Sequence, residues 1–176
     1  LKDMCDEITS GYSKRNCRAI AGIKSFIPID MSNVGTFTVD AAGVVTALTS
    51  SRTCFRYTLD VNSSSYTQSP TGDRANGAYN IVQAFTAIFK DDENTTDQAM
   101  NLFVQGYYGV IVELRNGKRK YLGAENGLTV TTIEMTSGLN GTDLAGSTLN
   151  MEGDENTVAP EIADVAIITA LLAPHS

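Results

Sequence analysis

Few residues of this chain are suited to acid–base or nucleophilic chemistry, and their positions argue against it. The chain has one histidine, His175, which is the second-last of 176 residues. Chain ends are usually frayed and solvated, so His175 lacks the fixed surroundings of a general base beside a nucleophile. Histidine-built zinc sites need several imidazoles on ordered elements. We therefore expect no histidine-dependent hydrolase and no histidine-built zinc site.

The three cysteines, Cys5, Cys17 and Cys54, have neither metal-ligand nor redox-motif spacing. There is no C-x-x-C pair, which is the spacing typical of structural zinc sites and thioredoxin-like motifs. An odd number also leaves one thiol unpaired, whatever pairs form. We interpret the cysteines as buried small hydrophobes in a reducing compartment.

The acidic residues form two short runs, 91–93 (DDE) and 152–155 (EGDE). Neither run has the alternating ligands and central glycine of a calcium loop, so we interpret them as a solvated helix cap and a solvated turn. Glycine-rich phosphate loops and a G-x-S-x-G elbow are absent from the sequence. Folding can still bring two carboxylates together, which leaves an enzyme as the last-ranked alternative. We expect no catalytic residue, no cofactor and no bound metal.

The composition predicts a folded, acidic domain. Acidic residues number 20 against 13 basic ones, the formal charge is −7, and 42% of the residues are hydrophobic. That apolar fraction supports a core, whereas a dedicated nucleic-acid binder is usually basic. The charge remains compatible with a protein past which nucleic acid moves without binding.

Alternation with a period of two dominates the chain and predicts strands. It is clear in Phe55–Val61 and in Val110–Leu114. Asn116-Gly117, followed by Lys118 and Arg119, predicts a tight hairpin turn that returns through Arg119–Leu122. Further strands are predicted at Ile23–Ile29, Gly35–Val39, Val44–Leu48, Tyr79–Phe89, Leu128–Met135 and Ser147–Met151. Tyr79–Phe89 is apolar on both faces, which predicts a cover on each, by a second layer and by a helix or neighbouring subunit.

One helix is predicted at Thr96–Gln105, with Gly106 as its stop. Its apolar stripe consists of Ala99, Met100, Phe103 and Val104. One helix among many strands predicts a mainly β fold, a β-sandwich or barrel-like set of antiparallel sheets with one flanking helix and extended loops or arms.

Two long stretches, Asn62–Gly77 and Thr136–Ala145, are rich in small polar residues and are predicted to be irregular. The first lies between two patterned strands, so we expect it to project as the tip of an extended hairpin. A mobile surface loop and an arm ordered by another subunit are both open interpretations. The apolar run Val165–Leu172 is predicted to be a last strand or an arm covered by a neighbour. We therefore divide the chain into a domain at 1–158, with the protruding loop 62–77, and a C-terminal segment at 159–176.

Three segments resemble, in order, tail proteins of phages that infect Bacteroidetes bacteria. The first is Cys5–Tyr12 with Asn16, Cys17, Arg18 and Gly22–Lys24; the second is Gly109–Gly127; the third runs from Thr136 to Gly153. In the second segment the shared features are a strand, the Asn-Gly-Lys hairpin, Leu-Gly and a closing glycine. The resemblance is to the family of phage major tail tube proteins.

The resemblance implies a non-enzymatic virion component, a β-sandwich with a flanking helix that forms stacked, hexameric rings. Its partners would be other copies, further tail or connector proteins, and double-stranded DNA that passes through the lumen without sequence-specific binding. The expected location is the virion tail, assembled in the bacterial cytoplasm, with no membrane contact. On this basis the ring-stacking contact is predicted in the long loop, at Ser63, Ser64, Ser65, Tyr66, Gln68, Asp73, Arg74 and Asn76.

A second class of function fits the same residues. A capsid decoration protein, a head–tail connector or a host-surface adhesion module would also use polar loops and a defined oligomer. Such a protein would form no tubes. Tube formation by the purified chain is therefore the observation that separates these alternatives.

Overall fold

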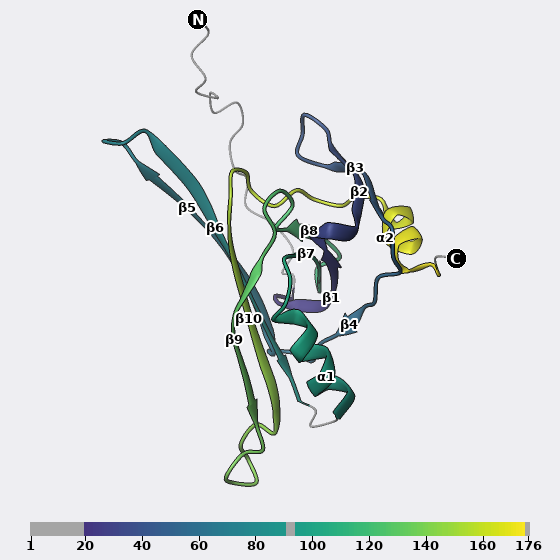
Figure 1. Cartoon of the computed structure of the whole chain (residues 1–176), viewed down its shortest axis with the longest axis vertical. Coiled ribbons are helices and arrows are strands. Elements are labelled where there is room, and N and C mark those ends of the chain that lie inside the picture. Colours follow the sequence, from purple (N-terminus) through teal and green to yellow (C-terminus); the bar gives the residue numbers. More distant parts are fainter. Residues whose placement is uncertain (1–19, 91–93, 175–176) are drawn as a thin grey trace, which may run out of the picture.

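Residues 20–90 and 94–174 are described by a computed structural model in which three layers pack face to face (Figure 1). The long sheet has the order β5-β6-β10-β9, with β5 at Ser64–Asp73, β6 at Ala78–Phe89, β10 at Gly146–Glu155 and β9 at Thr129–Thr136. The middle sheet has the order β4-β1-β7-β8, with β4 at Tyr57–Thr58, β1 at Ile23–Asp30, β7 at Tyr108–Leu114 and β8 at Arg119–Leu122. The third layer is the ribbon of β2 (Val34–Val39) and β3 (Val45–Ser50) with helix α2 (Val165–Leu172). Helix α1 spans Asn94–Phe103, and a 3-10 turn, η1, spans Met31–Asn33.

The middle sheet is buried on both faces, because consecutive side chains of a strand point to opposite sides. Phe26 and Val112 face the long sheet and pack in one core cluster with Phe85 and Leu149. Ile27, Ile29, Ile111 and Tyr121 face the other way and pack in a second cluster with β3 and α2. Burial of these two clusters from water is the main stabilising term of such a fold.

The predicted fold class is confirmed. The structure is mainly β with antiparallel sheets, and the strands of the described residues form no closed barrel. Eight of the predicted strands appear with ends within a few residues, and Arg119–Leu122 matches β8 at both ends. The turn at Asn116-Gly117 also forms, with Gly117 at φ 86° and the Lys118 N–H donating to Asn116 Oδ1 over 3.0 Å.

The prediction for Val165–Leu172 was wrong. This segment is helix α2, neither a strand nor an arm that waits for a neighbour. Asp164 caps the helix by accepting a hydrogen bond from the Ala166 N–H at 2.8 Å. Ile168 and Leu171 are buried in the second core cluster, which also contains residues of β3. Residues 20–90 and 94–174 therefore form two α-helices where one was predicted.

The predicted strand Phe55–Val61 was mostly wrong as well. Only Tyr57 and Thr58 pair, opposite Phe26 and Ser25 of β1. Phe55 and Val61 are largely exposed, at 68% and 56%. Alternation places side chains on two faces, but a strand also needs a partner for its backbone N–H and C=O groups.

The long stretch Asn62–Gly77 is not irregular, which corrects the sequence prediction. Most of it is strand β5, which pairs with β6 from Ser64↔Ala87 to Asp73↔Ala78. The expected projection is present, because the far end of the β5–β6 hairpin extends beyond the rest of the long sheet (Figure 1). The stretch after β9 is a loop as predicted, from Ser137 to Ala145.

Helix α1 presents part of the predicted stripe to the core. Met100 and Phe103 are buried in the cluster between the two large sheets. Val104 is 62% exposed, because the helix ends at Phe103 and the chain turns away. The acidic run 91–93, predicted to cap this helix, lies outside the described residues.

Candidate assembly surface

The long sheet has one face that no part of the described chain covers. We call it the outer face. It shows in the alternating burial of β6, where Ile81, Gln83, Phe85 and Ala87 are buried while the residues between them are half-exposed. Following the strand register across the sheet, the outer face consists of Ser65, Thr67, Ser69, Thr71, Asn80, Val82, Ala84, Thr86, Ile88, Thr148, Asn150, Glu152, Asp154, Thr129, Thr132, Glu134 and Thr136. The described residues therefore cover only one of the two faces of Tyr79–Phe89 for which a cover was expected.

The chemistry of the outer face is hydroxyl-rich and lacks basic residues. Its charged members are Glu134, Glu152 and Asp154, all acidic. The described lysines and arginines lie on the middle sheet, in loops or at strand ends, at Lys24, Arg52, Arg56, Arg74, Lys90, Arg115, Lys118, Arg119 and Lys120. A face of this kind carries no cation that would bind a phosphate group.

Both edges of the long sheet are free within the described part of the chain. β5 is the strand at one edge and β9 the strand at the other. Unpaired strand edges present rows of backbone donors and acceptors that can pair with another chain. The sheet thus has an uncovered face and two edges able to accept a neighbour.

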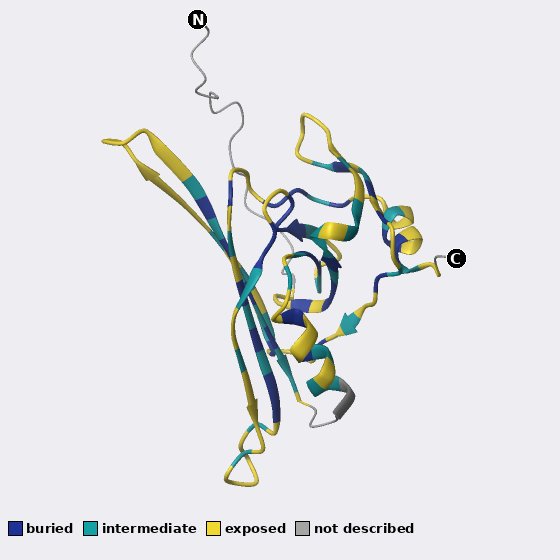
Figure 2. Ribbon diagram, viewed as in Figure 1, coloured by how far each residue is buried: buried dark blue, intermediate teal, exposed yellow. Residues whose placement is uncertain are grey.

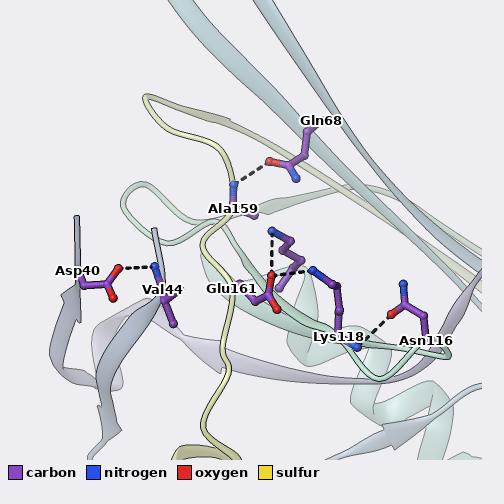
Figure 3. A network of polar contacts seen from close by, with 8 residues as sticks. Asp40, Val44, Gln68, Asn116, Lys118, Ala159 and Glu161 are labelled. Carbon is purple, nitrogen blue, oxygen red and sulfur yellow. Dashed lines mark hydrogen bonds and ion pairs between the residues drawn. The ribbon is translucent and has the colours of Figure 1, made fainter. Parts of the chain in front are cut away.

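The predicted stacking residues of β5 fall into two groups. Ser63 is buried and donates to the Asp60 carbonyl oxygen over 2.6 Å, and Ser64 and Tyr66 are half-buried on the inner face. Burial raises the pKa of Tyr66 above its ordinary value. Gln68 also points inward, where its side-chain oxygen accepts from the Ala159 N–H at 2.7 Å (Figure 3). Of the predicted stacking residues before the tip, only Ser65 lies exposed on the outer face.

Asp73, Arg74 and Asn76 lie at the exposed tip of the hairpin, as predicted (Figure 2). The Asp73 carboxylate accepts from the backbone N–H of Ala75 at 2.9 Å and is also bonded by the Asn76 side-chain amide. These bonds favour the ionised form and hold the pKa of Asp73 below its ordinary value. The tip is therefore a closed turn, and three of the eight predicted stacking residues remain available there for a contact.

The loop between β9 and β10 forms a second exposed tip at the opposite end of the long sheet (Figure 2). Asp143 accepts from the backbone N–H groups of Leu139 and Asn140 at 3.0 and 2.7 Å, which lowers its pKa. Leu139 itself is 93% exposed. The Asp143 carboxylate thus closes a turn in which the Leu139 side chain is exposed to solvent. The polar composition of the loop did not indicate this exposed apolar side chain.

The charged hairpin at Asn116–Arg119 is engaged within the chain. Lys118 Nζ lies 3.3 Å and Lys120 Nζ 4.0 Å from the same Glu161 carboxylate oxygen (Figure 3). The Arg119 carbonyl oxygen accepts from the Ile162 N–H. These contacts attach the segment before α2 to β8, and they pair Lys118 and Lys120 with an acid of the same chain.

Two buried polar side chains of the long sheet, which the sequence did not indicate as important, bind it to the turn between β8 and β9 and to the chain after β10. Glu155 is 2% exposed and accepts from the backbone N–H groups of Glu125, Asn126 and Gly127 at 2.9–3.2 Å. Gln83 is 1% exposed and accepts from the Gly123 N–H at 2.9 Å while donating to the Thr157 carbonyl oxygen. Buried polar groups of this kind stabilise a fold only when they are satisfied, and nothing in the local pattern identifies their partners.

The described part of the chain has no cluster of metal ligands and one free, buried thiol. Among residues 20–90 and 94–174, no group of three histidine, cysteine or acidic side chains is arranged to hold a metal. A hollow of about 310 Å³ lies beside Phe37, Val39 and Pro160, and Asp40 on its rim is occupied in accepting from the Ala42 and Val44 N–H groups at 2.9 Å. Cys54 is buried, which raises its pKa, whereas Cys5 and Cys17 lie outside the described residues.

Neither helix in the described part of the chain has the length and apolarity needed to cross a lipid bilayer. Comparison with family models, curated proteins and solved structures finds no match for this chain.

Proposed function

We propose that this chain is a structural subunit of a virion tail tube. Copies of the chain would close into rings, and the rings would stack into a channel for the genome. The resemblance to tail tube proteins implies six copies in each ring. The observation that carries the proposal is the uncovered outer face, which has acidic but no basic side chains and is flanked by two free strand edges. In a ring, the joined sheets would form the inner wall. Double-stranded DNA would slide along that wall without being held.

Physical chemistry supports this use of the face. Lysine and arginine contacts to phosphate supply nearly all non-specific DNA affinity, so a wall without them does not retain DNA. Glu134, Glu152 and Asp154 add weak repulsion that is screened within about 10 Å at moderate salt. Hydroxyl groups of threonine and serine keep the wall wetted.

The two projecting tips support the stacking of rings. The β5–β6 tip and the β9–β10 tip lie at opposite ends of the long sheet (Figure 1). A head-to-tail contact between unlike surfaces repeats without closing, which builds a filament. Rings would form through the sheet edges and tubes through the tips, and further tail or connector proteins would bind at the two ends of the tube.

Negative-stain electron microscopy of the purified full chain tests the proposal. We expect rings or tubes with a central channel, and the fraction of tubes should rise with protein concentration. A protein that stays monomeric at high concentration would contradict the proposal. A closed oligomer that never stacks would favour a decoration or connector protein instead.

A further inference from the structure

The two free edges of the long sheet are complementary in direction. Its four strands alternate, so β5 and β9 run antiparallel to each other. We propose that β9 of one copy pairs antiparallel with β5 of a second copy, with Tyr66 opposite Met135 and Thr67 opposite Glu134. This register rests on the ring assembly proposed above and goes beyond it by naming the residue pairs that join two subunits.

The faces of the sheet restrict the register to every second residue. A shift by one residue would turn each side chain of the joining strand to the other face. Thr67 and Glu134 both belong to the outer face, and Tyr66 and Met135 both belong to the inner face. Registers that keep the outer face continuous therefore differ by two residues.

The hydrogen-bonding groups of the two edges match in this register. The Ile88 N–H donates to the Ser63 carbonyl oxygen at 2.9 Å, so Ser63 and the alternate residues after it direct their N–H groups toward β6. Tyr66, Gln68 and Pro70 then face the free edge of β5. By the same alternation across the sheet, Ile133 and Met135 face the free edge of β9.

Pro70 marks the end of the regular ladder. Proline has no N–H, so in a sheet it belongs at an edge or opposite an irregularity. β9 has a bulge at Thr131, the extra residue between the pairs Asn150↔Thr132 and Met151↔Val130. The proposed register sets Pro70 opposite this bulge, whereas a shift of two residues one way sets it opposite Ile133 and interrupts a regular ladder.

The stagger between the edges excludes the shift in the other direction. Within the chain, one row runs from Ser65 through Thr86 and Asn150 to Thr132. In the proposed joint Ser65 lies opposite Thr136, four residues further along β9. A rise of about 13 Å over four strands about 4.8 Å apart tilts the strands by about 35°, within the range of closed barrels. A stagger of only two residues would give about 19°, well below that range.

The joint also covers apolar surface at the rim of the core. Met135 is 47% exposed, and Tyr66 of β5 is only half-buried where it packs against the core cluster. A methionine sulfur beside an aromatic ring is a favourable contact. The same stagger holds for any number of copies, and a hexamer would contain about 24 strands, more than the 16–18 of barrels that enclose an aqueous channel.

Cysteine pairs test the register in the assembled full chain. Thr67 is exposed on the β5 edge, and Thr132, Glu134 and Thr136 are exposed at alternate positions of β9. We combine T67C with each of T132C, E134C and T136C, apply a mild oxidant, and follow covalent oligomers on non-reducing gels. In the proposed register only T67C/E134C brings the two Cα atoms to about 4.5 Å, whereas the other pairs lie about 8 Å apart, beyond the reach of a disulfide.

We expect T67C/E134C to give a ladder of covalent oligomers. The amount of covalent oligomer should be at least tenfold larger than with T67C/T132C, T67C/T136C or T67C alone. Preferential cross-linking of either shifted pair would overturn the register while leaving the rings intact. Rings visible by microscopy without any cross-linking would overturn the edge pairing itself. Failure of all variants and of the unmodified chain to form rings would instead refute the proposed function, and the register with it.

Discussion

At the residue scale, the side chains that matter most are those that reach across layers. The side-chain oxygens of Glu155 and Gln83 accept hydrogen bonds from backbone N–H groups of the turn between β8 and β9. Gly153 has no Cβ, which allows that turn to lie close to the long sheet. Gln68 was predicted to contact a neighbour, yet its side-chain oxygen Oε1 accepts from the Ala159 N–H of the same chain. The type of a residue determines which hydrogen bonds it can make, and the fold determines which partner it bonds.

The close approach at Gly153 leads to a prediction for stability. A Cβ at this position would lie 2.5 Å from the Gly127 carbonyl oxygen and 3.0 Å from Leu128 Cδ2, and the first of these atoms belongs to the backbone and has little freedom to move. We expect Gly153→Ala to lower the free energy of unfolding by about 1–3 kcal/mol, or the Tm by roughly 2–10 °C. Thermal unfolding followed by circular dichroism measures this change.

Gly141→Ala is the matched control for this prediction. Gly141 lies in the exposed β9–β10 loop, where an added Cβ meets no atom within 4 Å. We expect an unchanged or slightly raised Tm, because alanine restricts the unfolded chain. A Tm of Gly153→Ala equal to that of Gly141→Ala and of the unmodified chain would show that the turn at Gly127 adapts and that the close approach does not matter.

At the scale of elements, β5 has two parts with separate roles. From Ser64 to Pro70 it is an integral edge strand that shares Tyr66 with the core and Gln68 with the C-terminal segment. Beyond the pair Pro70↔Ile81 the hairpin runs past the last paired row of β10, and it is exposed. Removing the whole stretch from Ser63 to Asn76 would therefore damage the fold, and only the tip is a separable device.

Shortening the tip separates stacking from folding. Deletion of Thr71, Gly72, Tyr79 and Asn80 removes two strand pairs and keeps both the order of faces and the turn that Asp73 closes. We expect an unchanged Tm and intact rings, but no tubes by negative-stain microscopy. The variant R74A/N76A keeps the length of the hairpin, so it shows whether reach or side-chain contacts matter. Normal tubes from the shortened chain would place the stacking contact elsewhere.

At the scale of the whole molecule, the distribution of charge is more informative than its sum. The formal charge of the full sequence is −7, and in the described part of the chain several acids serve as caps or ion pairs, among them Asp40, Asp164 and Glu161. What distinguishes the outer face is the lack of described lysine or arginine on it. The overall acidity by itself is therefore weak support for a DNA channel. The lack of lysine and arginine on the outer face is stronger support.

A single charge reversal tests the role of that face. Glu152→Lys places a cation on the outer face, and Asp60→Lys makes the same change of charge at an exposed site before β5. We expect assembled E152K, but not D60K, to retain double-stranded DNA at low salt, because each copy adds a phosphate contact. The slope of log affinity against log salt should grow by about 0.9 for each contact. Equal retention by both variants would argue against the outer face as the channel wall.

The sequence by itself determined most of the local structure, because alternation, the Asn-Gly turn and the helix stop act between residues a few positions apart. It also determined the class, mainly β with antiparallel sheets, and the presence of a projecting hairpin. The tertiary structure alone decided that Val165–Leu172 is a helix, that β5 is an ordered edge strand, and which face of β6 stays open. Those outcomes depend on which partner covers each apolar stripe and backbone edge, and such partners lie far away along the chain, where local patterns carry no information.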